Sequence, residues 1–99
     1  MNIIKKNSNK LNKLCKKYKV LKLYVFGSIT KGNFTDKSDI DFLVSFKKMD
    51  LYNYADNYFD FVFSLEDLFK RNIDLLEEKA LKNPYLIKSI DNSKELVYG

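Results

Sequence analysis

The chain has 99 residues, of which 45% are hydrophobic and 15% aromatic, enough for one compact domain with its own core. It has a net charge of +5, no histidine and one cysteine, so zinc sites and Ser-His or Cys-His catalysis are excluded. Any chemistry must use carboxylates, hydroxyls, lysines and a bound metal ion. We predict a single domain over residues 1–99.

The same composition bears on location and partners. Cys15 cannot form a disulfide within the chain and fits a reducing compartment, so we expect a cytoplasmic protein. No apolar run is long enough to span a membrane, and no signal peptide is evident. Residues 1–22 contain eight lysines and no acid, which is typical of a solvated helix face but can also attract polyanions. Arg71 is the only arginine, which disfavours sequence-specific DNA binding.

The first elements follow from the spacing of apolar residues. Asn7-Ser8-Asn9 can cap a helix whose apolar residues follow i, i+3, i+4, i+7 spacing: Leu11, Leu14, Cys15 and Tyr18. A thiol on this stripe is expected to be buried and inert. Strands are predicted at Val20–Phe26, before the Gly27-Ser28 turn, and at Ile40–Phe46.

The second half predicts a long helix over residues 51–70, capped by Asp50. One apolar stripe is formed by Leu51, Tyr54, Tyr58, Val62, Leu65 and Phe69. A second stripe, about 120° around the helix, contains Tyr52, Phe59 and Phe63. This second stripe is either buried between the sheet and another helix or exposed as an interaction surface.

A third strand is predicted at Asn72–Glu77, and Asn83-Pro84 predicts the start of a last helix that runs to about Leu96. The element order is therefore α-β-β-α-β-α. This order indicates an α/β (α+β) fold in which a small mixed β-sheet has flanking helices.

Two aspartates, Asp39 and Asp41, lie in one of the most apolar stretches of the chain. Residues i and i+2 of a strand point to the same face, so the carboxylates would lie side by side and repel unless a cation separated them. Mg²⁺ takes oxygen ligands from carboxylates and substrate phosphates, and two such ions can clamp the oxygens of a phosphoryl-type transfer. The pattern favours a Mg²⁺ site, although an isolated Asp-x-Asp is also typical of a solvated pair or a cap.

The Gly-Ser turn is the second candidate feature. Gly27 allows the backbone to turn tightly and approach a phosphate. Ser28 offers a hydroxyl and, if a helix begins there, free N–H groups that favour an anion. Lys31 can add a positive charge. A Gly-Ser pair after a strand is by itself also an ordinary turn.

Gly27-Ser28, ten intervening residues and Asp39-x-Asp41 together resemble the GS-x10-D-x-D signature of the DNA polymerase β-like nucleotidyltransferase superfamily. The sequence is most similar to the minimal branch, the small MNT-type proteins of bacteria and archaea, over nearly its whole length. Asp74, in "IDLL", falls where that family has its third carboxylate. The family's short mixed sheet with flanking helices agrees with the order predicted from periodicity.

The resemblance implies Mg²⁺-dependent transfer of a nucleoside monophosphate, AMP from ATP, to a hydroxyl group. Asp39 and Asp41 would hold two metal ions, and Asp74 would complete the ligands of the catalytic ion. Gly27-Ser28 would bind the triphosphate with help from Lys31. Many members have an Arg-x-Arg-Gly stretch where this chain has Ile-Thr-Lys-Gly, which implies weaker triphosphate binding or an altered nucleotide preference.

The chain has no room for a large acceptor-binding domain, so the acceptor is small or is held by another protein. In the MNT branch the partner is typically a HEPN-domain toxin, and the MNT protein acts as the antitoxin by adenylylating a tyrosine of that toxin. The resemblance therefore implies a HEPN-domain partner, and we expect either a homodimer or a hetero-oligomer. The alternative is a non-catalytic antitoxin that neutralises its partner by contact. A DxD glycosyltransferase needs a longer domain, and an EF-hand needs glycine where Val44 stands.

Overall fold

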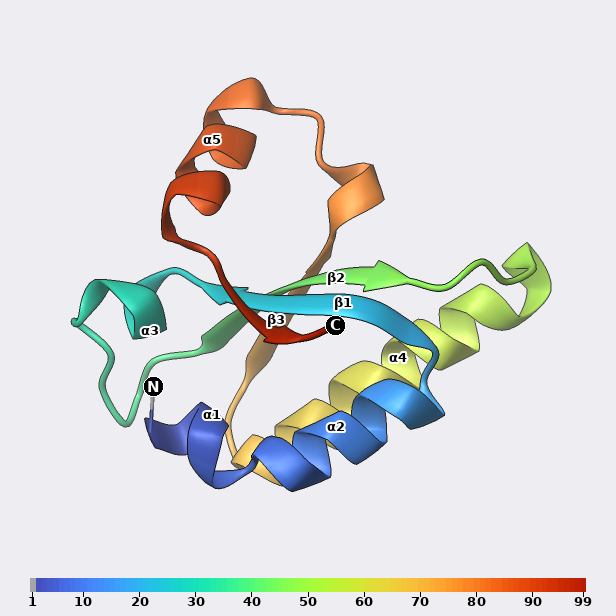
Figure 1. The fold of residues 1–99 in the computed structure, drawn as a ribbon, viewed down its shortest axis with the longest axis horizontal. Helices are drawn as coiled ribbons and strands as arrows, with labels where there is room; N and C mark the ends of the chain where they lie inside the picture. The colour runs from blue at the N-terminus through green and yellow to red at the C-terminus, as the bar shows by residue number, and fades with distance from the viewer. Residues whose placement is uncertain (1) are drawn as a thin grey trace.

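The computed structural model describes residues 2–99, and a four-stranded sheet in the order β3-β2-β1-β4 forms its centre (Figure 1). Strand β1 (Val20–Phe26) pairs antiparallel with β2 (Ile40–Phe46) and with β4 (Glu95–Tyr98). Strand β3 (Ile73–Glu77) pairs parallel with β2. The sheet is therefore mixed, which confirms the predicted α/β (α+β) class.

Helices cover both faces of this sheet, with the N-terminal helices and the long helix on one side and the last long helix on the other (Figure 1). Within the described part of the chain, no helix combines the length and hydrophobicity needed to cross a membrane. The helical segments are α1 (Asn2–Lys6), α2 (Ser8–Lys17), α3 (Ser28–Lys31), α4 (Leu51–Phe69), the 3₁₀ turn η1 (Glu78–Ala80) and α5 (Pro84–Ser93).

The main core lies between the sheet and helices α2 and α4. Alternate residues of β2 point into it, namely Ile40, Phe42 and Val44, and all three are fully buried. Phe61 of α4 is also fully buried, and its ring centroid lies 5.7 Å from that of Tyr18. Burying each such side chain contributes about 1.5–3 kcal/mol to stability. The odd-numbered residues of β2, including Asp41, therefore face the opposite side of the sheet, where α5 packs.

Cys15 is fully buried in this core. Burial raises the pKa of its thiol to about 12. A thiol with such a pKa is almost entirely protonated at neutral pH and is a poor nucleophile. The prediction of a buried, inert cysteine is confirmed.

Helix α4 confirms the predicted helix over residues 51–70, and the Asp50 carboxylate caps it by accepting a bond from the Asn53 amide at 3.0 Å. The predicted core stripe was wrong at its first position, because Leu51 is 90% exposed. The N-terminal end of α4 extends past the sheet, and Phe61, which the stripe omitted, is in the core.

The second stripe of α4 is exposed rather than wedged between elements. Tyr52, Phe59 and Phe63 are 92%, 55% and 62% exposed. We call these three residues the aromatic face.

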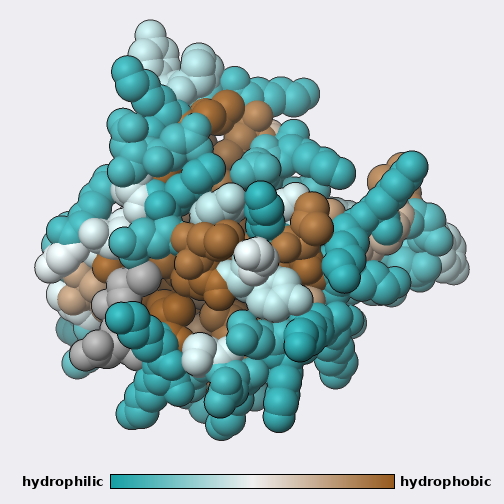
Figure 2. Space-filling view, viewed as in Figure 1, coloured by the Kyte–Doolittle hydropathy of each residue, from teal (hydrophilic) through white to brown (hydrophobic). Residues whose placement is uncertain are grey.

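Apolar surface also appears elsewhere on the molecule. Figure 2 shows a hydrophobic area in the middle of the face drawn, ringed by hydrophilic side chains. Leu21 on β1 and Leu96 on β4 are half exposed.

The C-terminal prediction was partly wrong. Asn83 caps α5 and Pro84 is its first residue, as predicted, and the Asn83 side chain accepts bonds from two backbone amides. The helix ends at Ser93 instead of continuing to Leu96, and the chain then forms β4. Pairing Leu96 with Tyr24 gives the outer edge of β1 hydrogen-bond partners that a helix could not supply.

The N-terminal prediction also needs a correction. A short helix, α1, precedes the predicted one, and Asn7 stands between the two. The Asn7 side chain does not cap α2, because its amide donates to the carbonyl of Ile3 at 2.8 Å. Asn7 therefore stabilises the end of α1 rather than the start of α2.

Candidate functional site

Two of the predicted carboxylates are neighbours across the parallel strands. Asp41 of β2 is in register with Asp74 of β3, and adjacent strands lie about 4.8 Å apart, so both side chains leave the same face of the sheet. Asp39 precedes β2 by one residue and is two residues from Asp41, which places it on the same side in an extended chain. The fold therefore brings the three predicted carboxylates to one end of the sheet.

The electrostatics of Asp41 reflect this crowding. Partial burial raises the pKa of its carboxyl group, and the negative charges of Asp74 and Asp39 raise it further. Repelling carboxylates on one face form a donor set that suits a hard divalent cation. Within residues 2–99, no three acidic side chains already stand together as ligands of one metal ion. Side-chain rotation would have to complete such a site.

Gly27 lies directly against this carboxylate. It follows β1, whose last residue, Phe26, pairs with Asp41, and it has φ +78° and ψ −144°, a conformation open almost only to glycine. A Cβ atom built at Gly27 would lie 2.3 Å from Oδ2 of Asp41. The Asp41 carboxylate thus occupies the position that a side chain at residue 27 would need, and only glycine lets the turn come this close to it.

Helix α3 begins at Ser28, as the Gly-Ser turn predicted, and spans a single turn. The carbonyl of Gly27 accepts bonds from the backbone amides of Thr30 and Lys31, at 3.1 and 3.2 Å, and from the Thr30 hydroxyl at 2.9 Å. Ser28 is half-buried, whereas Lys31 is exposed at the C-terminal end of the turn. Contacts of Ser28 and Lys31 with a triphosphate stay predictions.

The face of the sheet that carries Asp41 also has a hollow beneath α5. Its walls include Leu43 of β2 together with Ile87 and Ile90 of α5. Asp91 and Lys94, at its rim, form an ion pair of 2.9 Å. This hollow lies on the same face of the sheet as Asp41, but none of the three aspartates is among the residues that line it.

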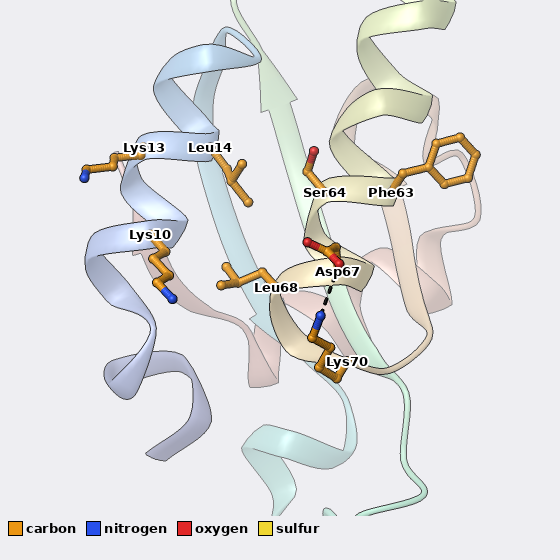
Figure 3. Close-up of a pocket in the computed structure, with 8 residues that line it drawn as sticks. All are labelled: Lys10, Lys13, Leu14, Phe63, Ser64, Asp67, Leu68 and Lys70. Atoms are coloured by element: carbon orange, nitrogen blue, oxygen red, sulfur yellow. Dashed lines mark hydrogen bonds and ion pairs between the residues drawn. The ribbon is translucent and has the colours of Figure 1, made fainter.

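A second groove lies between α2 and α4 (Figure 3). Lys10 and Lys13 line it from α2, and on the α4 side Lys70 forms an ion pair of 3.1 Å with Asp67. These helices cover the face of the sheet opposite to the carboxylates. The groove is therefore separate from the candidate active site.

Sequence reasoning gave Arg71 no role in the site. The structure places it immediately before β3, where its side chain contacts the loop that leads to Asp39. No periodicity or motif indicates this contact, because its acceptors are loop carbonyl oxygens rather than side chains.

Comparison with known proteins gives consistent matches. The family model described as polymerase beta, nucleotidyltransferase matches residues 9–99. A Methanocaldococcus jannaschii protein, provisionally named protein adenylyltransferase MJ1379, is 35% identical over 96 residues, which cover 96% of this chain and 93% of that protein.

Solved structures show the same fold. A structure described as a minimal nucleotidyltransferase superposes with a TM-score of 0.77 at 23% identity, covering 96% of this chain and 95% of its own. The MNT antitoxin complex with a tri-AMPylated Shewanella oneidensis HEPN toxin gives a TM-score of 0.66 at 20% identity, covering 97% of this chain and 72% of that one. The predicted polymerase β-like nucleotidyltransferase fold is confirmed.

Proposed function

Since the chain belongs to the family of polymerase beta nucleotidyltransferases, we propose that it transfers AMP from ATP to a hydroxyl group of a partner protein. The observation that carries this proposal is the pairing of Asp41 with Asp74 across parallel strands, with the side-chain-free Gly27 against the Asp41 carboxylate. We expect a cation and a phosphate to bind beside these carboxylates, where the backbone of the Gly27 turn comes close to Asp41.

The residues present fit a magnesium site. Asp39 and Asp41 would be its main ligands, and Asp74 would complete the ligands on the acceptor side. Bound Mg²⁺ would supply the positive charge that neutralises the triphosphate and the developing charge at the α-phosphate. Gly27-Ser28 would approach the phosphates with backbone amides, and Lys31 would add a positive charge.

In the proposed reaction, the acceptor oxygen attacks the α-phosphorus of ATP and the bond to the bridging oxygen of pyrophosphate breaks. The acceptor loses its proton, and pyrophosphate leaves. Asp74 would orient the attacking oxygen, because its side chain is exposed on β3, an edge strand of the sheet.

The proposed acceptor is a tyrosine of a HEPN-domain toxin, and the chain would act as the antitoxin. Two kinds of relative support this: a homologue provisionally named a protein adenylyltransferase, and a structural neighbour in complex with an AMPylated HEPN toxin. The second candidate function is neutralisation by contact alone. The exposed aromatic face of α4 supports it, because exposed apolar surface of this kind is typical of interfaces.

Labelled ATP distinguishes these functions. The purified chain is incubated with Mg²⁺, a HEPN-domain protein from the same genome, and ATP labelled on either the α- or the γ-phosphate. We expect label on the HEPN protein only from the α-phosphate, and peptide mass spectrometry should place AMP on a tyrosine. Label from the γ-phosphate would indicate a kinase instead. Co-purification of the two proteins without any label would favour the contact-only antitoxin.

The aromatic face gives a separate prediction about the partner. Phe59→Glu with Phe63→Glu should yield a soluble, folded protein that no longer co-purifies with the HEPN protein, because charges are depleted at the centre of interfaces. The matched control is Asp56→Glu with Asp60→Glu, which changes the same helix without altering its charge. A melting temperature equal to that of the wild type would show that the fold is intact. Unfolding of the double phenylalanine variant, or retained co-purification, would contradict the interface.

A further inference from the structure

The guanidinium group of Arg71 connects the loop before Asp39 to the start of β3. Its Nη1 donates to the carbonyl oxygens of Thr35, at 3.2 Å, and Ser38, at 3.0 Å. Its Cζ lies 4.6 Å from the centroid of the Phe34 ring. The Arg71 side chain is half-buried, and among the described residues its Nε is shielded from solvent without a hydrogen-bond partner.

The two peptide groups that flank Asp39 are both held by consecutive residues. The carbonyl oxygen of Ser38 belongs to the peptide that joins it to Asp39, and Arg71 donates to it. The amide of Ile40 belongs to the peptide on the other side, and it donates to the carbonyl of Asn72 at 3.2 Å. The position of the Asp39 backbone is therefore set by residues 71 and 72.

These two residues lie directly before β3, the strand that carries Asp74. We infer that Arg71 is a positioning residue for the metal site, whose guanidinium group holds the backbone of Asp39 against the strand of Asp74. This inference rests on the proposed function, because the group positioned is a proposed metal ligand. Arginine suits the task because its planar fork can bond two carbonyls and stack on a ring at the same time.

The turn that Arg71 holds is stabilised locally as well. The Ser38 amide donates to the Thr35 carbonyl at 3.0 Å, and the Thr35 amide donates to the Ser38 hydroxyl at 3.0 Å. The turn can therefore keep its own shape without Arg71. What Arg71 adds is the connection of this turn to β3.

Metal binding tests the inference, because losing the charge of Arg71 and losing its positioning role should change the metal dissociation constant in opposite directions. The Mn²⁺ dissociation constant is measured by calorimetry, with a non-hydrolysable ATP analogue, for the wild type and for Arg71→Gln. Removing a positive charge near a cation site should tighten cation binding by Coulomb's law. If Arg71 positions Asp39, Arg71→Gln should instead raise the dissociation constant by about 10-fold or more, the usual cost of losing an outer contact to a metal ligand.

Lys70→Asn is the matched control. It removes one positive charge from the adjacent residue, and asparagine tolerates the left-handed conformation of that position, φ +56°. Lys70 pairs only with the exposed Asp67 among the described residues, so its loss leaves the loop intact. We expect Mn²⁺ affinity within about twofold of the wild type, since exposed charges are well screened. A loss equal to that of Arg71→Gln would overturn the inference.

Hydrogen exchange of the metal-free protein tests it independently of any transfer activity. Arg71→Gln should speed exchange of the Ile40 amide, which donates to the Asn72 carbonyl, while the Ser38 amide within the turn and the amides of β1 keep their wild-type rates. Arg71→Lys keeps the charge but not the fork, so it should recover only part of the Mn²⁺ affinity. Unchanged exchange and unchanged Mn²⁺ affinity in Arg71→Gln, or full recovery by lysine, would overturn the inference. A wild type that binds Mn²⁺ but transfers no AMP would contradict only the proposed function.

Discussion

Asp41→Asn is expected to abolish AMP transfer while leaving the metal-free protein at least as stable as the wild type. Loss of an outer contact to a metal ligand commonly costs 10–100-fold, so loss of a proposed ligand should exceed about 100-fold. Stability should not fall, because asparagine keeps the shape of aspartate and removes a charge that burial and two nearby carboxylates disfavour. The measurements are transfer from α-labelled ATP and thermal melting with and without Mg²⁺ and ATP.

The stability difference between Asp41→Asn and the wild type should depend on pH. The pKa of Asp41 is raised in the folded protein above its ordinary value of 3.8, so the folded state binds the proton more tightly than the unfolded state. The stability contributed by this group is therefore present below pH 3.8 and is lost as the pH rises through the raised pKa. Asp41→Asn should remove this loss, so that its advantage over the wild type appears as the pH rises toward neutrality.

Asp60→Asn is the control for this prediction, because it makes the same substitution at an exposed position of α4. It should keep wild-type transfer and wild-type stabilisation by Mg²⁺ and ATP. Ligand bound to the folded state raises its melting temperature, so Asp41→Asn should lose most of that rise. If Mg²⁺ and ATP stabilised the wild type and Asp41→Asn equally, Asp41 would not be part of the binding site.

The sequence predicted most of the fold because its signals are local. Short runs rich in Val, Leu and aromatic residues, the first of them ended by the Gly27-Ser28 turn, indicated β1 and β2 with the boundaries that the structure has. Strand β4 was missed because Glu95–Tyr98 continues directly from a helix without a glycine or proline, and its strand conformation depends on pairing with β1, far away in the sequence. Phe61 was missed because the apolar stripe was counted from Leu51, which placed it on a side of the helix that does not include Phe61.

The candidate site, like the fold, has features that could be predicted from the sequence and features that could not. The resemblance of Gly27-Ser28 and Asp39-x-Asp41 to the nucleotidyltransferase signature implied that the turn and the two carboxylates belong together, and the structure places Gly27 against Asp41. The contact of Arg71 with the preceding loop could not be predicted, because backbone carbonyls leave no pattern in a sequence. Residue types therefore indicate which groups act, whereas the contacts that position them come from the fold.

Gly27→Ala is expected to be the most damaging substitution outside the carboxylates. Its φ of +78° with ψ of −144° costs a residue with a side chain about 1–3 kcal/mol. The new Cβ would also lie 2.3 Å from the Asp41 carboxylate, a distance that forces one of the two groups to move. We therefore expect a lower melting temperature and the loss of stabilisation by Mg²⁺ and ATP, with transfer reduced by about 100-fold or more for a shift of about 1 Å.

Gly32→Ala separates backbone strain from the effect on the site. Gly32 has φ +82°, close to that of Gly27, but a Cβ there would have no neighbour within 4 Å. Alanine at Gly32 should cost about 1–2 kcal/mol of stability through strain alone and leave transfer per folded molecule unchanged. If both alanine variants lose stability and transfer to the same extent, strain in the turn explains the effect. If only Gly27→Ala loses nucleotide binding, the close approach of the turn to the Asp41 carboxylate is what the glycine provides.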